Sequence, residues 1–132
     1  MASADDLATI PLFSPLSDSD LRKLAAWFDV QTASPGVCLI GEGAAGYSFF
    51  VLTQGNAVVT SESATLATLG PGDFFGEVAI LGNGRRSATV TTTAPSMLLV
   101  MFGTEFRQLQ AAHPEIAHEI QEAMRRRVAA RN

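Results

Sequence analysis

The chain has 132 residues, a hydrophobic content of 47% and a single cysteine, Cys38. This length and composition suit one globular domain with a buried core, and they exclude disordered and fibrous proteins. A formal net charge of -4 argues against a general nucleic-acid-binding protein, which needs a basic surface to displace counterions from phosphates. One cysteine excludes an internal disulfide, so we predict that Cys38 is a small buried hydrophobe in a protein of a reducing compartment.

The sequence carries no sign of a membrane span. No apolar stretch approaches the roughly 20 residues that a membrane helix needs, and residues 1–6 lack the basic and apolar regions of a signal peptide. We therefore expect a soluble, cytoplasmic chain with no membrane contact of its own. The cytoplasmic domain of a membrane protein is equally compatible with this expectation.

The N-terminal segment, residues 1–29, is predicted to be helical. A short turn is expected over residues 5–10 and a longer helix over residues 17–28, with a proline-rich break between them. Ser17 has the spacing of a helix N-cap. Trp27 lies beside the apolar face of the longer helix, so we predict that it packs against the core and does not stack on a ligand.

Residues 30–102 change to short apolar and β-prone runs punctuated by glycine, the pattern of a β-sandwich or small β-barrel. Two pairs of neighbouring runs are predicted to form hairpins, one turned at residues 53–56 and the other at Ala94 and Pro95. The strands predicted from this pattern are residues 37–40, 48–52, 57–60, 65–69, 88–92 and 96–101.

The helical period returns in residues 103–132. Thr104 is predicted to be the N-cap of a helix that ends at Ala112. Pro114 suits the first turn of a second helix, which should continue to about Arg131.

Residues 72–90 combine glycines, one carboxylate and adjacent arginines between two apolar runs. The short run after Glu77 predicts one or two helical turns, whose unpaired N–H groups can bind a phosphate. A glycine-rich reversal would then bring Arg86 and Ser87 back over the start of that helix, where both can donate hydrogen bonds to the phosphate. Glu77 is an anion and cannot bind phosphate, but it can accept a hydrogen bond from a ribose hydroxyl. The pattern therefore predicts a nucleotide site.

The segment FGEVAILGNGRRSATV, residues 75–90, resembles the phosphate-binding cassette of the cyclic nucleotide-binding domain family. In that family Phe-Gly-Glu precedes an aliphatic, a small and an aliphatic residue, and after a short loop an arginine precedes a small residue, Ala, Thr or Ser, and an aliphatic residue. The segment LIGEGAAGYSFFVLTQG, residues 39–55, is similar to a second signature of the family. Arg85 stands where many members carry proline, and the spacing from Glu77 favours Arg86 as the phosphate ligand.

The resemblance implies a mainly β fold, with an eight-stranded antiparallel jelly-roll β-barrel, N-terminal helices and two C-terminal helices, the last of which acts as a lid. It implies that residues 1–132 form a single cyclic nucleotide-binding domain. Within that domain Glu77 would accept the ribose 2′-hydroxyl and Arg86 would pair with the cyclic phosphate, while backbone amides complete the phosphate site. The ligand-binding residues that the resemblance implies are Phe75, Gly76, Glu77, Val78, Ala79, Arg86, Ser87 and Ala88.

One more ligand-binding residue, Arg127, is predicted from helix geometry. Ile116, Ile120 and Ala123 are four and three residues apart, so they form a stripe that should face the barrel. Four residues further on, the same stripe reaches Arg127. The resemblance to the family's lid residues implies that its guanidinium stacks on the base and holds the helix closed. The alternative is that its stem covers apolar surface while its charged end stays in water.

The predicted function is a regulatory sensor that binds a 3′,5′-cyclic nucleotide, cyclic AMP in preference to cyclic GMP, and moves its C-terminal helix to signal occupancy. We predict no enzyme activity, no catalytic residue, no metal and no cofactor. A cupin-like metalloenzyme is disfavoured because the two histidines, His113 and His118, are five residues apart on a predicted helix and share no face. A ligand-free interaction module is the other alternative, and Glu77 and Arg86 at the family's spacing argue against it.

The cyclic nucleotide is the predicted partner, and no direct contact with nucleic acid is expected from this chain. The sequence looks most like the sensor domains of bacterial cyclic nucleotide-gated channels. It is also related to the sensor of the catabolite activator family, in which a DNA-binding helix-turn-helix follows the long helix. A fused channel, enzyme or effector domain is compatible with this prediction, as is a homo-oligomer.

Overall fold

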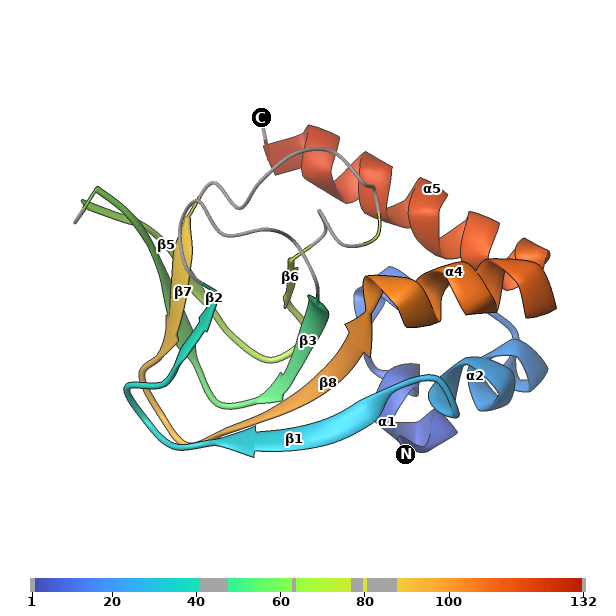
Figure 1. The fold of residues 1–132 in the computed structure, drawn as a ribbon, viewed down its shortest axis with the longest axis horizontal. Coiled ribbons are helices and arrows are strands. Elements are labelled where there is room, and N and C mark those ends of the chain that lie inside the picture. Colours follow the sequence, from blue (N-terminus) through green and yellow to red (C-terminus); the bar gives the residue numbers. More distant parts are fainter. Residues whose placement is uncertain (1, 41–47, 63, 77–79, 81–87, 132) are drawn as a thin grey trace.

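The computed structural model describes residues 2–40, 48–62, 64–76, 80 and 88–131. Two four-stranded antiparallel sheets face each other, and the helices lie on one side of this sandwich (Figure 1). The first sheet has the strand order β1-β8-β3-β6, and the second has the order β2-β7-β4-β5. The predicted jelly-roll fold is therefore confirmed. The strands are β1 (Asp29–Ala33), β2 (Cys38–Ile40), β3 (Ser48–Gln54), β4 (Ala57–Ser61), β5 (Ala64–Leu69), β6 (Phe74–Phe75), β7 (Thr89–Thr92) and β8 (Ser96–Phe102).

Both predicted hairpins are wrong. β3 lies in the first sheet and β4 in the second, while β7 lies in the second and β8 in the first. Each short connection therefore crosses from one sheet to the other. The two crossings also touch, because the Thr93 N–H donates to the Asn56 carbonyl at 2.9 Å. The sequence pattern identified six of the eight strands but could not assign them to sheets, since alternation is the same in either sheet.

β3 contributes buried side chains to the core from both of its faces. Phe49 and Val51 belong to a larger apolar cluster shared with the helices, whereas Phe50 and Leu52 belong to a smaller cluster between the two sheets. This division follows from the two-residue period of a strand, in which successive side chains point to opposite faces. In the smaller cluster Phe50 stacks on Phe75 of β6, with ring centroids 5.0 Å apart.

The helices close the larger cluster over the first sheet. Ser17 caps α2 as predicted, because its hydroxyl accepts a hydrogen bond from the Asp20 N–H at 3.2 Å. Thr104 is not the cap of α4, which corrects the prediction. The N-cap is Phe102, so the helix begins two residues earlier than predicted, without a capping hydroxyl. The Glu105 carboxylate accepts a hydrogen bond from the Phe102 N–H at 2.9 Å. The helices are α1 (Ala4–Ala8), the 3-10 helix η1 (Pro11–Phe13), α2 (Asp18–Ala25), α4 (Gly103–Ala112) and α5 (Pro114–Arg131).

Cys38 is exposed, so the prediction of a buried cysteine is wrong. Cys38 begins the short edge strand β2, and the pairing register of that strand shifts between Cys38 and Ile40. Such an irregularity breaks the alternation of side chains, and Ile40 alone of the two is buried. Trp27 is partly buried against the larger cluster, which confirms its predicted role in packing. Among the described residues, no helix is long and apolar enough to cross a membrane.

Candidate functional site

The structure describes four of the predicted ligand-binding residues: Phe75, Gly76, Ala88 and Arg127. Phe75 ends β6 in the first sheet, and Ala88 immediately precedes β7 in the second sheet. The predicted cassette therefore begins at one sheet and ends at the other. The remaining five predicted residues, Glu77, Val78, Ala79, Arg86 and Ser87, lie outside the described residues.

Gly76 has a left-handed backbone conformation at the start of the predicted cassette. Its φ angle is 79°, in the left-handed region where a residue with a Cβ atom is strained. Phe75 and Gly76 are both buried. The glycine therefore allows the chain to turn at the end of β6, and the buried Phe75 fixes the position of this turn.

Ile80 connects the cassette to α5. Its side chain is 5% exposed and belongs to the larger apolar cluster, together with Ile116 and Ile120 of α5. The Gln121 side-chain amide donates a hydrogen bond to the Ile80 carbonyl oxygen at 3.4 Å. Neither residue was predicted to contribute to the site, because an aliphatic residue and an amide on a helix carry no signal for a contact between distant segments.

The predicted stripe of α5 is buried, but Arg127 at its end is exposed. Ile116, Ile120 and Ala123 are each less than 5% exposed. Arg127 lines a pocket of about 280 Å³ between η1, the corner before the cassette and α5. With the residues that the structure describes, its guanidinium forms no ion pair or hydrogen bond, whereas Arg125 pairs with Glu122 at 2.7 Å. The other residues lining this pocket are Pro11, Leu12, Pro71, Gly72, Asp73 and Phe74.

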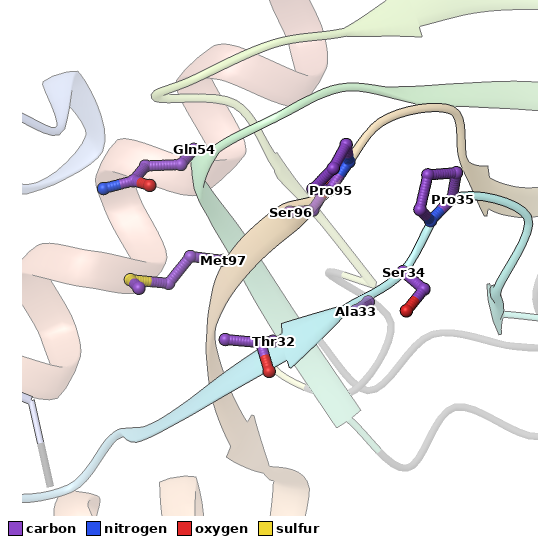
Figure 2. A pocket seen from close by; sticks show the side chains of 8 residues that line it. All are labelled: Thr32, Ala33, Ser34, Pro35, Gln54, Pro95, Ser96 and Met97. Atoms are coloured by element: carbon purple, nitrogen blue, oxygen red, sulfur yellow. The ribbon is translucent and has the colours of Figure 1, made fainter.

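A second pocket, of about 420 Å³, lies beside the C-terminal end of β3, where Gln54 is one of its lining residues (Figure 2). The side chains of Thr32, Gln54 and Met97 extend into it from three neighbouring strands. None of its lining residues is charged, so it offers no counter-charge to a phosphate. Its remaining lining residues are Ala33, Ser34, Pro35, Pro95 and Ser96.

The described residues show no arrangement suited to a metal. No group of three or more His, Cys, Asp or Glu side chains among them could hold a metal ion. His113 lies between α4 and α5, and His118 lies near the start of α5. The candidate site is the cassette together with the Arg127 pocket.

Residues 30–113 match the family model described as "Cyclic nucleotide-binding domain", and this segment includes both motifs identified in the sequence. The chain is 38% identical over 105 residues to a cAMP-dependent protein kinase regulatory subunit of Yarrowia lipolytica, covering 78% of this chain and 28% of the relative. It is 34% identical over 127 residues to a cyclic nucleotide-gated potassium channel of Mesorhizobium japonicum, covering 94% of this chain and 35% of the channel.

The fold agrees with solved structures of the same kind. The N-terminal domain of a transcriptional regulator from Streptomyces coelicolor superposes with a TM-score of 0.82 at 29% identity, covering 97% of this chain and 95% of that one. The curated relatives named above are much longer, since the chain spans about a third or less of their length. The resemblance identified from the motifs is thus confirmed at the level of family and fold.

Proposed function

Because the chain belongs to the cyclic nucleotide-binding domain family, we propose that it binds a 3′,5′-cyclic nucleotide and signals occupancy through α5. Domains of this family are regulatory and non-catalytic. The observation that carries the proposal is the conjunction of Glu77 and Arg86 at the family's spacing within the matched segment. The left-handed Gly76 at the start of the cassette supports it.

In the proposed complex Glu77 accepts a hydrogen bond from the ribose 2′-hydroxyl, and Arg86 pairs with the cyclic phosphate. The backbone N–H groups of Ala79, Ser87 and Ala88 complete the phosphate site, as the family resemblance implies. Charge-assisted hydrogen bonds of this kind are about twice as strong as neutral ones, so the two charged side chains would dominate the affinity.

Cyclic AMP is the proposed ligand in preference to cyclic GMP. The support comes from relatives, because the regulatory subunit of Yarrowia lipolytica is named for its dependence on cAMP. Ser87 carries a hydroxyl that is able to reach a guanine amine, so cyclic GMP is the competitor to test.

The contact between Ile80 and α5 supports the proposed signal. A phosphate that reorganises the cassette would displace Ile80, and Ile80 packs with the buried stripe of α5 and accepts from Gln121. A ligand that favours one position of the cassette therefore shifts the population of α5 positions. Arg127 is the proposed lid residue, whose guanidinium stacks on the base when α5 is docked.

We further propose that residues 1–132 work as one cytoplasmic module whose output depends on what it is joined to. The Mesorhizobium japonicum relative is a potassium channel and the Streptomyces coelicolor structure is part of a transcriptional regulator. A channel, a kinase regulator or a transcription factor would each be able to use a shift of α5.

Titration calorimetry tests ligand binding. With about 100 μM protein we expect a saturable heat for cyclic AMP, because a micromolar site corresponds to roughly 8 kcal/mol of binding free energy. Cyclic GMP should bind more weakly. The absence of heat with both nucleotides would remove the proposed function.

A comparison of Arg127→Ala with Arg125→Ala tests the lid. Arg125 pairs with Glu122 on the surface of α5, so its loss should leave affinity for cyclic AMP nearly unchanged. Arg127→Ala should weaken binding by about 0.5–2 kcal/mol, the usual contribution of a cation–π contact. Hydrogen exchange of residues 116–128 should slow when the nucleotide is bound. Equal affinities of the two variants together with unchanged exchange would exclude the lid and leave the cassette proposal intact.

A further inference from the structure

Asp73 and Arg127, which are far apart in the sequence, line the same pocket. The pocket walls come from the N-terminal helix η1, from the corner at residues 70–74 and from α5, which packs against η1. The corner leads directly into β6 and the cassette. The pocket is therefore the place where the N-terminal segment, the entry to the cassette and the lid helix meet.

The corner holds Asp73 in a fixed position. Its carbonyl oxygen accepts from the Leu52 N–H at 2.8 Å, and the Gly72 N–H donates to the Leu52 carbonyl at 2.7 Å, so the corner is anchored to β3. The Asp73 carboxylate accepts from the Gly70 N–H at 2.8 Å through Oδ2. Oδ1 is not used by this hydrogen bond, and it remains available to a donor from the pocket.

Arg127 is the charged donor in this pocket. Its guanidinium forms no ion pair or hydrogen bond with the part of the chain that the structure describes. A guanidinium has two distinct recognition surfaces, because its edge donates to carboxylates while its flat face stacks on aromatic rings. A carboxylate at the edge therefore leaves the face open and reduces the orientations that the group samples.

No ion pair joins Asp73 to Arg127 in this structure, although both line the pocket. We propose that Asp73 is a positioning residue for the lid: when a nucleotide is bound, its carboxylate pairs with the edge of the Arg127 guanidinium, so that the face of the guanidinium meets the base. This inference rests on the proposed function, since it assumes that Arg127 caps a bound base. Asp73 itself does not touch the ligand. It acts through Arg127, and it links the corner before the cassette to the docked position of α5.

A double-mutant cycle with cyclic AMP tests the coupling. Asp73→Asn removes the charge, while its amide oxygen is still able to accept from the Gly70 N–H, so the corner keeps its hydrogen bond. Both side chains are exposed, so we expect Asp73→Asn to weaken binding about two- to fivefold, as for an exposed ion pair. In the Arg127→Ala background the same change should have no effect on the dissociation constant.

Two further variants make the result specific. Asp73→Glu keeps the charge and should restore part of the affinity that Asp73→Asn loses. Asp29→Asn removes an exposed aspartate on β1 and should change nothing. Equal weakening by Asp73→Asn in both backgrounds, or no weakening in either, would overturn the inference. A parent protein that binds neither cyclic AMP nor cyclic GMP would instead overturn the proposed function.

Discussion

The two ends of the β-sandwich differ in how they use their polar groups. The crossing end, residues 33–37, 53–57 and 92–97, pairs them internally: the buried Thr92 hydroxyl donates to the Ser34 carbonyl at 2.7 Å and accepts from the Val37 N–H at 2.9 Å. The cassette end consists of residues 74–76, 80 and 88–90 with the second half of α5. Here Arg127 has no partner among the described residues.

This difference indicates which end contributes to folding stability and which end contributes to ligand binding. Buried polar groups that are hydrogen-bonded to each other hold a fold together, because leaving any one of them unpaired costs free energy. A charged group without an internal partner contributes little to folding and stays available for a ligand. Variants at the crossing end should therefore change unfolding, and variants at the cassette end should change binding.

The largest expected effect is that of Arg86→Ala on binding. Loss of the direct counter-charge of the phosphate in a partly desolvated pocket should weaken cyclic AMP binding by roughly 2–5 kcal/mol. Calorimetry measures the affinity, and urea unfolding should show nearly unchanged stability. Arg85→Ala is the matched control and should matter far less. If Arg85→Ala proved the more damaging change, the assignment of the phosphate ligand would be reversed.

At the crossing end, Gly55→Ala should destabilise the fold by roughly 2–4 kcal/mol. Gly55 has a φ of 93°, and an added Cβ would overlap the Ser96 hydroxyl and lie 2.5 Å from the Pro95 carbonyl oxygen. Gly36→Ala separates the strain of a positive φ from the effect of the close contacts. Gly36 has a φ of 86° but nothing within 4 Å of its Cβ position. Urea denaturation of both variants measures the difference, and equal losses of stability would show that the close contact contributes nothing.

Glu77→Ala should weaken binding of cyclic AMP by about 1.5–3 kcal/mol, the range for a hydrogen bond to a charged group. The effect should depend on the ribose. A 2′-deoxy cyclic nucleotide has no hydroxyl to donate, so the parent and the variant should bind it about equally. A comparable loss for both nucleotides would contradict the role of Glu77 at the 2′-hydroxyl.

Of the four changes compared, Thr92→Val has the smallest expected effect, at about 1–3 kcal/mol of unfolding free energy. The substitution keeps the shape of the side chain but removes the hydroxyl that bridges Ser34 and Val37. Thr93→Val is the control, because Thr93 is exposed and should be nearly neutral. Affinity for cyclic AMP should be unchanged in both. A large loss of affinity with Thr92→Val would contradict the assignment of stability to the crossing end and of binding to the cassette end.

Much of the fold could be predicted because local patterns report local structure. The proline before Glu115 begins α5 as expected, and the alternation of Phe49, Phe50 and Val51 marks a strand that is buried on both faces. β1 and the two-residue β6 were not found from periodicity. β1 has an exposed pattern without apolar alternation, and β6 is too short to show any period.

Some residues of the candidate site could likewise be predicted from the sequence, and others could not. Its motif residues follow one another closely in the chain, so their type and spacing can be recognised from the sequence alone, and the match over residues 30–113 supports them at the level of the family. Arg127 was predicted from the four-residue period of α5, and its binding role stays a prediction. Its neighbour Asp73 and the contact of Gln121 with Ile80 were not, because no sequence pattern joins segments so far apart.

The sequence by itself determined most of the elements and the cassette motif, because helix periods, strand alternation, glycine positions and motif spacing all depend on residues that are near neighbours in the chain. The tertiary structure alone decided that β3 and β4 lie in different sheets, that Cys38 is exposed, and that Asp73 shares a pocket with Arg127. These outcomes depend on how distant segments pack, and packing is set by the free energy of the whole core and not by any single stretch of residues.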